Sequence, residues 1–476
     1  MGSVVYVQVT RAAEKAVSRQ NGCTTIHLEE TAMRKNTCTR SFHDCLSQFL
    51  TPQVWKQAHQ AWRADYSPPR WSLQPLVWVL LSMAWCCGDS HDERFATARA
   101  VYVAAHQRSR RPGSTLAGFL QALAKLPMPV LRTLARGVRE RLDAQFVEAL
   151  RINGWVPLAC DGSRLECPRS AELQQRLGEA GKTDSAPMVY LTALVLLPLG
   201  VLWSWRLGKG TASEHDHLRR LLPTLPERSL IVADACYLGY DLFQAILRAR
   251  ASFLVRLSSR AYLYTQEHVP LTQYHEGEVY YWPNEIRDAN QPPIVGRLLR
   301  VGGAKADVWL LTNVLDGHQL SHATAAQVYR WRWKNEGLFR DYKRMLKKVK
   351  LQSRTVASVH REAEGSLLAL QLLLAVAAAA VQRGRTTVLI MNSPRQMLLR
   401  LRSGMTALVR SLGPRQFAQY QRMLEEVRSQ ERPHRISAKV RQEWPRRKPH
   451  KPPKPPNLRV MDEALKTKLA TILSAA

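Results

Sequence analysis

Apolar residues recur at helical spacing over the first third of the chain. In residues 41–153 they fall three and four positions apart, with arginine and lysine on the opposite side, as in TLAGFLQALAKLPMPVLRTLARGVRERL (115–142). The stretches GDS (88–90) and RPGS (111–114) are typical helix breaks. We therefore predict a helical domain over 41–153, preceded by a loose arm at 1–40. Its basic face suits DNA binding and a solvated structural bundle equally well.

From Trp155 the pattern changes to short apolar runs separated by helical segments. Strand-like runs are expected in WVPLAC (155–160), at 188–197, at 200–207, in SLIVAD (229–234) and in ASFLVRL (251–257). Helices are expected from about Ser213 and in YDLFQAILRAR (240–250). An initial hairpin followed by strands that alternate with helices indicates an α/β domain with a mixed sheet.

Residues 262–316 interrupt this alternation. Their runs are short, aromatic and rich in turn residues, which predicts a β subdomain inserted into the α/β domain. A long helix is expected over 322–350, followed by a helical C-terminal region at 351–428. The region 429–476 is a basic, proline-rich tail, and we expect its stretch at 431–460 to be extended or disordered.

Three apolar runs approach the length of a membrane span. The run at 71–87 is short and interrupted, and the run at 186–205 is broken at 198–200, as two buried strands joined by a tight turn would be. The run at 366–382 has Gln371 in its middle and arginines immediately after it, which favours a buried helix. We therefore predict a soluble protein without a membrane partner.

The charge balance indicates a polyanionic partner. Lysine and arginine total 69 against 38 aspartates and glutamates, which gives a formal net charge of +31 at pH 7. Such an excess favours nucleic acid or an acidic membrane surface. The eight cysteines form no CxxC pair, which argues against a zinc site and is typical of reduced intracellular thiols.

The stretch YRWRWKNEGLFRDYK (329–343) concentrates this charge on one side of the expected helix. One face, with residues spaced by about 100° each, carries Tyr329, Arg332, Glu336 and Lys343. The opposite face, expected to pack on the core, carries Trp331, Leu338, Tyr342 and Met345. Glu336 is then the single carboxylate in a cationic strip. It either forms an intrahelical ion pair, worth about 0.2–0.5 kcal/mol, or has a functional role.

Two further acids follow apolar runs upstream. Asp161 ends PLACD and Asp234 ends LIVAD, and the carboxyl edge of a buried strand is where α/β folds build sites. Three such acids in a strongly basic protein suggest a divalent metal held against phosphate. Mg²⁺ prefers carboxylate oxygens, and the surrounding cations would hold the nucleic-acid backbone.

These residues resemble the signature of a known family. Tyr329, Arg332, Glu336 and Lys343 fit Y-(2)-R-(3)-E-(6)-K, the signature of the insertion-sequence-4 family of bacterial DDE transposases. DGSRL (161–165) and IVADACYLGYDLF (231–243) are similar to the first and second acidic blocks of the family. The resemblance covers residues 150–350, approximately.

The resemblance implies a ribonuclease-H-like catalytic core over 154–350, with the β insertion at about 262–316. Asp161, Asp234 and Glu336 would be its catalytic acids and the ligands of two Mg²⁺ ions, for which Mn²⁺ can substitute. One ion would activate the attacking water or DNA 3′-hydroxyl, and the other would stabilise the leaving oxygen.

The resemblance also implies how DNA would be bound. Arg332 and Lys343 would clamp phosphates near the cut, and Tyr329 would help to place the strand. Proteins of this type cut double-stranded DNA at element ends and join those ends to target DNA. We expect a homodimer, because paired ends require two active sites. The family holds a displaced base with insertion-domain aromatics, for which Trp309 and Trp282 are candidates, with packing in the core as the alternative.

Three other residues near the acids are expected to be structural. His215 and His217 would point away from each other on a helix, which argues against a shared metal and favours hydrogen bonding or exposure. Cys160 precedes Asp161 in the expected strand, so its side chain faces the other way and packs.

The leading hypothesis is a cut-and-paste DNA transposase that acts in the bacterial cytoplasm, at the nucleoid. A catalytically inactive or domesticated transposase-derived DNA-binding protein is the first alternative. A nuclease on the same core, which cuts without joining, is the second. A membrane-surface protein is less favoured, because the basic residues are spread along the chain instead of flanking one amphipathic helix.

Overall fold

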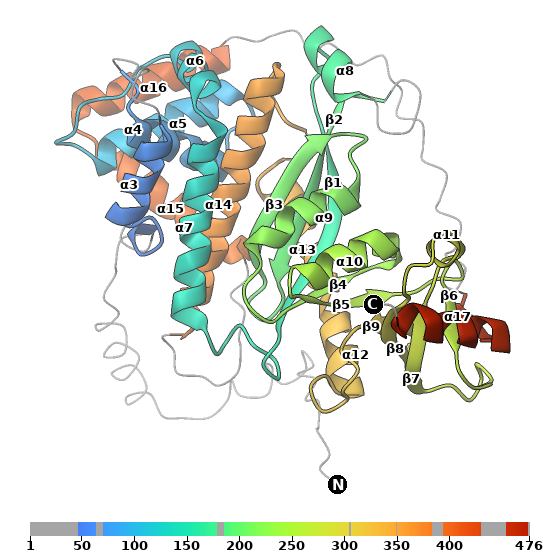
Figure 1. Ribbon diagram of the computed structural model, residues 1–476. Helices are drawn as coiled ribbons and strands as arrows, with labels where there is room; N and C mark the ends of the chain where they lie inside the picture. The colour runs from blue at the N-terminus through green and yellow to red at the C-terminus, as the bar shows by residue number, and fades with distance from the viewer. Residues whose placement is uncertain are drawn as a thin grey trace, which may run out of the picture. The chain divides into compact units, whose positions relative to one another are not determined.

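The strands form one ten-stranded mixed sheet (Figure 1). The computed structural model describes residues 46–62, 70–178, 185–303, 306–348, 350–382, 394–429 and 454–474, so the predicted arm at 1–40 lies outside the described residues. The strands are β1 (Val156–Glu166), β2 (Met188–Leu196), β3 (Val201–Lys209), β4 (Ser229–Ala233), β5 (Ser252–Arg256), β6 (Tyr262–Thr265), β7 (Glu276–Tyr281), β8 (Ile294–Val301), β9 (Val308–Thr312) and β10 (Asn457–Val460). Their order across the sheet is β10-β6-β7-β8-β9-β5-β4-β1-β2-β3.

One half of this sheet, β3-β2-β1-β4-β5, is a ribonuclease-H-like core. Strands β1, β2 and β3 form an antiparallel meander, and β4 and β5 then lie parallel to β1. Parallel neighbours need crossover connections, which are supplied by α9 (Glu214–Leu221) before β4 and α10 (Tyr240–Arg248) before β5. The fold class predicted from the alternation of strands and helices is confirmed.

The apolar run at 186–205 consists of two paired strands. Strands β2 and β3 are almost entirely buried and pair with each other antiparallel. The turn at 197–200 ends on Gly200, whose φ of 61° lies in the left-handed region that glycine adopts without strain. The prediction of two buried strands joined by a tight turn is therefore confirmed.

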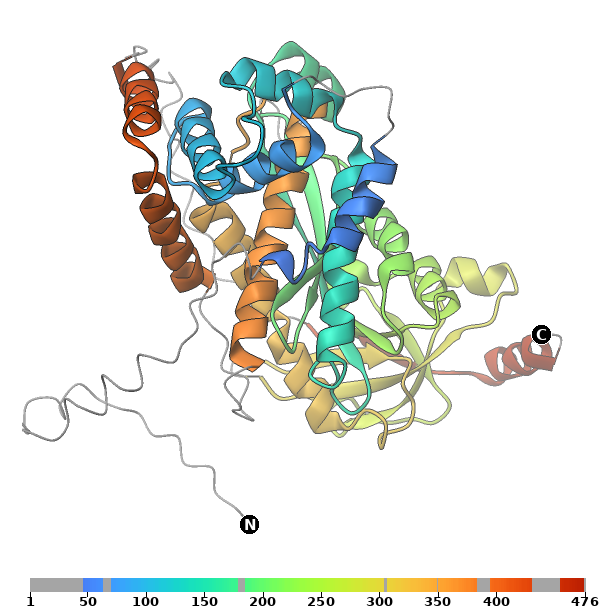
Figure 2. The same cartoon turned by 90° about the vertical axis from the view of Figure 1, so that its left-hand side faces the viewer.

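Helices from both ends of the described chain pack together beside β3. The first group is α3 (Pro52–Ala61), α4 (Leu73–Trp85), α5 (His91–Ala105), α6 (Leu116–Lys125) and α7 (Met128–Phe146). The second group is α14 (Val356–Gln382), α15 (Pro394–Arg410) and α16 (Pro414–Ser429). Helix α14 packs against α4, α6, α7 and β3, and Figure 2 shows it running alongside α7. The helices predicted at 41–153 are thus completed by partners from the C-terminal region.

The predicted breaks in the first group are places where helices begin. The Ser90 hydroxyl oxygen accepts a hydrogen bond from the Glu93 N–H at 3.1 Å at the start of α5. At the start of α6, the Thr115 hydroxyl oxygen accepts from the Gly118 N–H at 3.3 Å. A side-chain oxygen in this position satisfies an N–H group that the helix itself leaves without a partner. The stretches at 88–90 and 111–114 therefore act as helix boundaries.

By length and composition, α14 is the one described helix that reaches the requirements for crossing a membrane. Within Val356–Ala379, however, 94% of its most apolar window is buried inside the protein. Gln371, in the middle of this run, donates from its side-chain amide to the Trp203 carbonyl at 3.0 Å. A buried amide bonded to a neighbouring strand is typical of a core helix. The prediction of a buried helix at 366–382 is confirmed.

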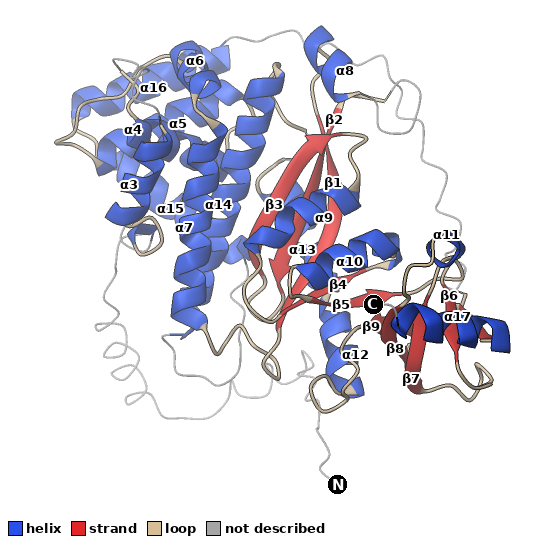
Figure 3. Ribbon diagram, in the orientation of Figure 1, coloured by secondary structure: helices blue, strands red, loops and turns tan. Residues whose placement is uncertain are grey.

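The inserted strands β6, β7 and β8 continue the core sheet through β9, which pairs with β5. Strand β10 pairs in parallel with β6, and α17 (Glu463–Ser474) lies across these inserted strands (Figure 3). Their shared small core contains Tyr264, Tyr280, Trp282, Met461 and Leu469. Within 431–460, where an extended or disordered tail is expected, residues 457–460 are extended but pair with β6 as β10. Helix α17, which follows, was not predicted, and it forms because its apolar side chains pack in this small core. Residues 430–453 lie outside the described residues.

The prediction of one long helix over 322–350 is wrong, because the structure has two shorter helices there. Helix α12 spans His322–Trp331 and α13 spans Trp333–Met345. Between them the Arg332 N–H bonds to the Tyr329 carbonyl, three residues back, at 3.1 Å, and such a bond tightens the turn. Lys347 lies beyond α13 with a φ of 53° and pairs with Asp89. The helical cationic strip therefore ends before Lys347.

Candidate active site

Asp161 and Asp234 lie level with each other on neighbouring strands. The parallel pairing of β1 with β4 runs to Ala159 opposite Val232, and two more residues in this register bring Asp161 beside Asp234. Neighbouring strands are about 4.8 Å apart. Strand β4 ends just before Asp234, whereas β1 continues to Glu166. The prediction that Asp161 ends its strand is therefore wrong. Strand β1 continues past Asp161, which lies two residues beyond the last parallel pair with β4.

Each aspartate is fixed by a hydrogen bond from the backbone. The Asp161 Oδ1 atom accepts from the Gly162 N–H at 2.8 Å. The Asp234 Oδ1 atom accepts from the Cys236 N–H at 2.9 Å and so caps the 3₁₀ turn Ala235–Tyr237. Each bond uses one carboxylate oxygen and holds the acid at the open edge where β4 stops.

Glu336 approaches this edge from α13, which packs against β1. Its side chain is exposed in the first turn of that helix. Burial raises the pKa of Asp161 to about 6, and the negative charges of Asp234 and Glu336 add to this rise, while the Gly162 N–H and the Arg332 guanidinium oppose it. The fold thus brings three acids from distant parts of the chain near one another.

Arg332 lies between two aromatic rings next to the acids. Its side chain is 5% exposed, and its guanidinium carbon is 5.6 Å from the centre of the Tyr329 ring and 5.3 Å from that of Trp333. A cation on an aromatic face is stabilised by about 0.5–2 kcal/mol, depending on how far it is desolvated. Tyr329 itself belongs to the core beneath the sheet. The two rings therefore hold the guanidinium where its charge acts on Asp161.

The predicted DNA-binding residues differ in their exposure. Tyr329 and Arg332 are buried, whereas Lys343 is half-buried and burial lowers its pKa. Lys343 stands about 10 Å along α13 from Glu336, at 1.5 Å per residue. The expected shared face of Tyr329, Arg332 and Lys343 is therefore not uniformly accessible, because Tyr329 packs in the core from α12 and the Arg332 side chain is covered by neighbouring rings. Contacts of these residues with DNA stay predictions.

The donor set suits a hard divalent cation. Asp161, Asp234 and Glu336 supply carboxylate oxygens, the ligands that Mg²⁺ and Mn²⁺ prefer, and a bound cation would relieve the repulsion among their charges. Among the described residues, no three His, Cys, Asp or Glu side chains converge closely enough to form a ready-made metal site. The acids fit a divalent cation by their chemistry, and binding would require them to draw closer together.

The histidines and the cysteine near the acids are structural, as predicted. His217 is buried and its Nδ1 atom lies 2.9 Å from the Thr192 hydroxyl oxygen. The His215 Nε2 atom lies 2.8 Å from the Cys236 carbonyl oxygen. Cys160 is buried, and burial raises the pKa of its thiol far above the usual range. The two histidine rings therefore serve separate hydrogen bonds.

The two tryptophans considered for holding a displaced base are packed in the protein. Trp282 is completely buried and donates from its indole N–H to the Gln291 carbonyl at 2.9 Å. Trp309 is buried as well, with the Arg300 guanidinium carbon 5.7 Å from its ring centre. Both tryptophans are packed in the core, which is the alternative considered for them. Trp333, three residues before Glu336 in the chain, is 58% exposed.

Sequence reasoning missed one acid at this site. Glu214 begins α9, and burial raises the pKa of its carboxyl, with further increases from the charges of Asp234 and Asp161. The signal available in the sequence was a glutamate at the start of the helix predicted after the β-hairpin. The local pattern predicts that helix, but it does not reveal that the helix starts next to β1.

The segment that carries the three acids matches a known domain. A ribonuclease-H-like core with acids on β1, after β4 and on a later helix is the arrangement that the resemblance to DDE transposases implies. The family model described as "Transposase DDE domain" matches residues 156–372, a little less than half of the chain. This match begins with β1 and includes Asp161, Asp234 and Glu336.

Comparison with solved structures finds a similar transposase complex. The cryo-electron microscopy structure of a piggyBac transposase synaptic complex with hairpin DNA is similar at 11% sequence identity and a TM-score of 0.42. The similarity covers 80% of this chain and 84% of that chain. No curated protein sequence gives a significant match. Residues 156–372 are thus similar to transposase DDE domains, and the narrower assignment to the insertion-sequence-4 family stays a prediction.

Proposed function

We propose that this protein is a DNA transposase that cleaves the terminal inverted repeats of its own element and transfers the freed strands to target DNA. One observation carries the proposal. The residues matched by the transposase domain include Asp161, Asp234 and Glu336, and these acids lie near one another at the open edge beside β4. The insertion-sequence-4 signature at 329–343 supports the narrower proposal of cut-and-paste transposition.

The reaction is a phosphoryl transfer in two similar steps. In cleavage, a water oxygen bonds to the phosphorus while the bond to the 3′-oxygen breaks, and the water proton passes to solvent or to a carboxylate. In joining, the freed 3′-hydroxyl attacks a target phosphate in the same way. Two Mg²⁺ ions, or Mn²⁺ in their place, would lower the pKa of the attacking group and stabilise the leaving oxygen. Asp161, Asp234 and Glu336 would hold them.

The cationic residues of α12 and α13 would position the DNA strand. Arg332, held between two rings, offers a fixed guanidinium for a phosphate next to Asp161. Lys343 would contact the backbone about two turns further along α13. Tyr329 would act through Arg332 by supporting its guanidinium. Trp333 presents an exposed ring on which an unpaired base can stack.

The partners follow from the reaction. The substrate would be double-stranded DNA at both transposon ends and at the target, for which the formal net charge of +31 is favourable. Two ends require two active sites, so we propose a homodimer in the synaptic complex. The place of action would be the bacterial cytoplasm, at the nucleoid.

A cleavage assay tests this function. The full-length protein is incubated with Mg²⁺ and linear DNA that carries the inverted repeats flanking its own coding region. We expect nicks at the repeat ends and joined products, both lost in Asp161→Asn, which should still bind the DNA. The matched control is Glu140→Gln, an exposed acid on α7 that pairs with Arg136.

Three results would separate the proposal from its alternatives. Binding of the repeats without any nicking would indicate a catalytically inactive DNA-binding protein. Metal-dependent nicking without joined products would indicate a nuclease. Cleavage at an unchanged rate in Asp161→Asn would show that these acids are not the catalytic ones.

A further inference from the structure

The helical domain contains a long stretch of sequence without a single acid. Residues 94–139 hold eight arginines and one lysine but no aspartate or glutamate, whereas the whole chain has 38 acids against 69 lysines and arginines. Three of these arginines, Arg108, Arg110 and Arg111, fall within four residues of the loop between α5 and α6. The planar fork of arginine N–H groups matches the geometry of a phosphate. We call residues 107–111 the basic loop.

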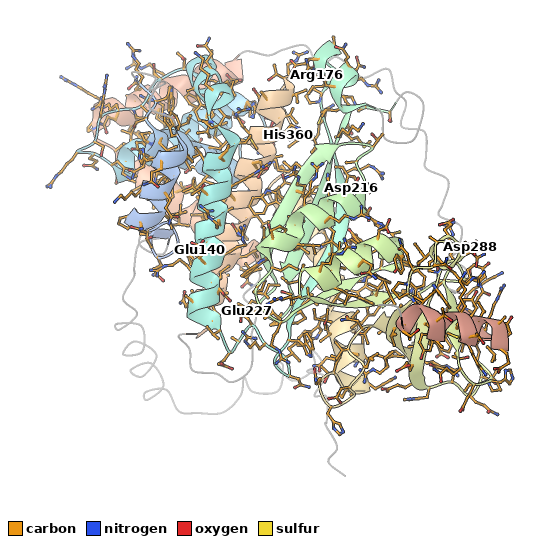
Figure 4. The ribbon with its side chains drawn as sticks, viewed as in Figure 1. Glu140, Arg176, Asp216, Glu227, Asp288 and His360 are labelled. Atoms are coloured by element: carbon orange, nitrogen blue, oxygen red, sulfur yellow. The ribbon has the colours of Figure 1, made fainter. Side chains whose placement is uncertain are left out.

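The charge of the basic loop is not neutralised by the protein. Its three arginines are exposed, and in the described part of the chain none of them pairs with a carboxylate. Other surface arginines do have such partners. Arg136 pairs with Glu140 at 3.7 Å and Arg219 with Asp216 at 2.8 Å, and Figure 4 labels both acids. The basic loop is therefore open to an anion from outside.

The chain just after the basic loop is held firmly in place. Arg99 of α5 donates from its Nε–H to the Gly113 carbonyl at 2.9 Å, and the Gly113 N–H donates to the Arg70 carbonyl at 3.2 Å. Gly113 also lies against Trp71, because a Cβ atom on it would come within 2.5 Å of the indole nitrogen. A loop anchored in this way loses little conformational entropy when it binds a partner, which favours binding.

A depression beside the basic loop combines two cations with two amides. It lies between α5 and α16, and its lining includes Arg99, Arg111, Gln416 and Gln419. Burial lowers the pKa of Arg99, and the positive charge of Arg111 lowers it further. A phosphate group in this depression would relieve the repulsion between the two guanidiniums. It would also accept hydrogen bonds from the guanidinium and amide N–H groups.

The basic loop lies away from the three acids. In Figure 1 the loop between α5 and α6 is among the helices at the left, whereas β1 and β4 lie near the middle of the molecule. The connection between the two places is indirect, since α5 packs against α15, and α15 packs against α13. A contact at the basic loop would therefore hold duplex DNA that lies beyond the strand being cut.

Resting on the function proposed above, we propose that the basic loop binds the backbone of double-stranded DNA outside the active site, with Arg108, Arg110 and Arg111 contacting phosphates. This assigns a DNA contact to the helical domain, for which sequence pattern left DNA binding and a solvated bundle equally open. Phosphate contacts position a duplex without reading its sequence. The basic loop thus adds affinity for any duplex and leaves recognition of the repeats to other residues.

Fluorescence anisotropy with the full-length protein and labelled duplexes tests this inference. In Arg108→Gln/Arg110→Gln, each lost phosphate contact should reduce the slope of log affinity against log salt by about 0.9, and the affinity at about 0.1 M salt should fall by about tenfold or more. The loss should be the same for the inverted repeat and for a scrambled duplex. The matched control, Arg136→Gln/Arg219→Gln, removes as much charge from arginines that have carboxylate partners, and should keep the wild-type slope.

An unchanged salt slope in Arg108→Gln/Arg110→Gln would overturn the inference. An equal loss in the control would overturn it as well, because it would show a general effect of net charge. So would a loss confined to the inverted repeat, which would indicate contacts with bases. If the double variant does not fold, Arg110→Gln decides, with about half the change in slope.

The cleavage assay on the inverted repeats separates this inference from the proposed function. Nicking by the wild type, together with a wild-type salt slope in Arg108→Gln/Arg110→Gln, removes only the role of the basic loop. A reduced slope in that variant, together with no nicking by the wild type, removes only the proposed catalysis.

Discussion

Trp333 presents its indole ring to solvent three residues before Glu336. An exposed ring next to the proposed acids is a stacking surface for an unpaired base, and such stacking is worth about 1–3 kcal/mol per base. We expect Trp333→Ala to weaken binding of a single-stranded DNA end by about tenfold or more. Fluorescence anisotropy with a labelled oligonucleotide measures this change.

The control for Trp333 is another exposed apolar side chain. Leu399 on α15 is 53% exposed, and Leu399→Ala should bind the same oligonucleotide with wild-type affinity. Both variants should keep the thermal stability of the parent, because neither side chain is buried. Equal affinities in Trp333→Ala and Leu399→Ala would argue against a stacking role.

At the scale of residues, the proximity of Asp161, Asp234 and Glu336 was predictable, because apolar runs and a motif with fixed spacing mark these acids in the chain. Their catalytic role stays a prediction. The proximity of Glu214 to β1 was not predictable, because it depends on where α9 starts in space. Helical spacing places Trp333 in the same arc as Glu336, but it does not reveal that the indole ring is exposed.

Among the elements, α14 is tied to the segment after α13 by a buried ion pair. The Lys348 ammonium donates to Glu362 at 2.7 Å, and both side chains are buried. The Ser353 N–H donates to the same carboxylate at 2.9 Å. We expect Glu362→Gln to lower the free energy of unfolding by about 3–5 kcal/mol, because it leaves a buried ammonium without its counter-charge. Urea unfolding at pH 7 measures the loss.

The same carboxylate makes stability depend on pH. Burial alone would raise the pKa of Glu362, but Lys348, His91 and the hydrogen bonds to the carboxylate lower it from 4.5 to about 2. A group whose pKa is lowered by folding stabilises the protein above its unfolded value, and this contribution disappears as the pH falls through the folded value. The difference between wild type and Glu362→Gln should therefore be full above pH 4.5 and shrink toward pH 2.

The surface pair of Glu140 and Arg136 provides the comparison for both measurements. Their charged atoms are 3.7 Å apart on α7, and both side chains are exposed. An exposed pair of this kind contributes about 0.3–0.5 kcal/mol, so Glu140→Gln should unfold almost as the wild type does. A similar loss in the two variants would contradict the role given to the buried pair.

The helices and strands themselves were largely predictable, and the exceptions have physical causes. The hairpin at 186–205 and the buried helix at 366–382 follow from apolar runs interrupted at particular residues. The break at Arg332 does not, because the sequence on either side has helical spacing and no glycine or proline within four residues of it. Strand β10 was hidden by the proline-rich stretch that precedes it, whereas α17 lies in a segment without proline and was simply not predicted. Both are ordered by a distant surface around Trp282.

For the whole molecule, the C-terminal helix α17 is expected to stabilise the inserted strands. Leu469 is buried in the core shared with Tyr264 and Trp282, whereas Leu473 on the same helix is 54% exposed. Leu469→Ser should increase hydrogen exchange in β6 and β7 and leave β1 and β4 protected. Leu473→Ser, the matched control, should exchange as the wild type does. Unchanged protection of β6 in Leu469→Ser would show that the insertion is stable without this contact.

The net charge of the chain predicts a strong dependence of DNA affinity on salt. A protein that contacts about 6–10 phosphates loses about 10³–10⁵ in affinity between about 50 and 200 mM salt, because condensed counterions are released on binding. We expect a loss of at least about a thousandfold for DNA of any sequence. A weak salt dependence would mean that the excess of 31 positive charges serves another purpose.

The packing of α14 against α4, α6 and α7 has a consequence for synthesis. A ribosome that has translated only as far as α13 holds a nascent chain whose first helices still lack the packing surface of α14. The scaffold behind β3 can close only after more than three quarters of the polypeptide has emerged. Premature termination between Glu336 and α14 would thus leave a chain with every proposed catalytic acid and an incomplete support for them.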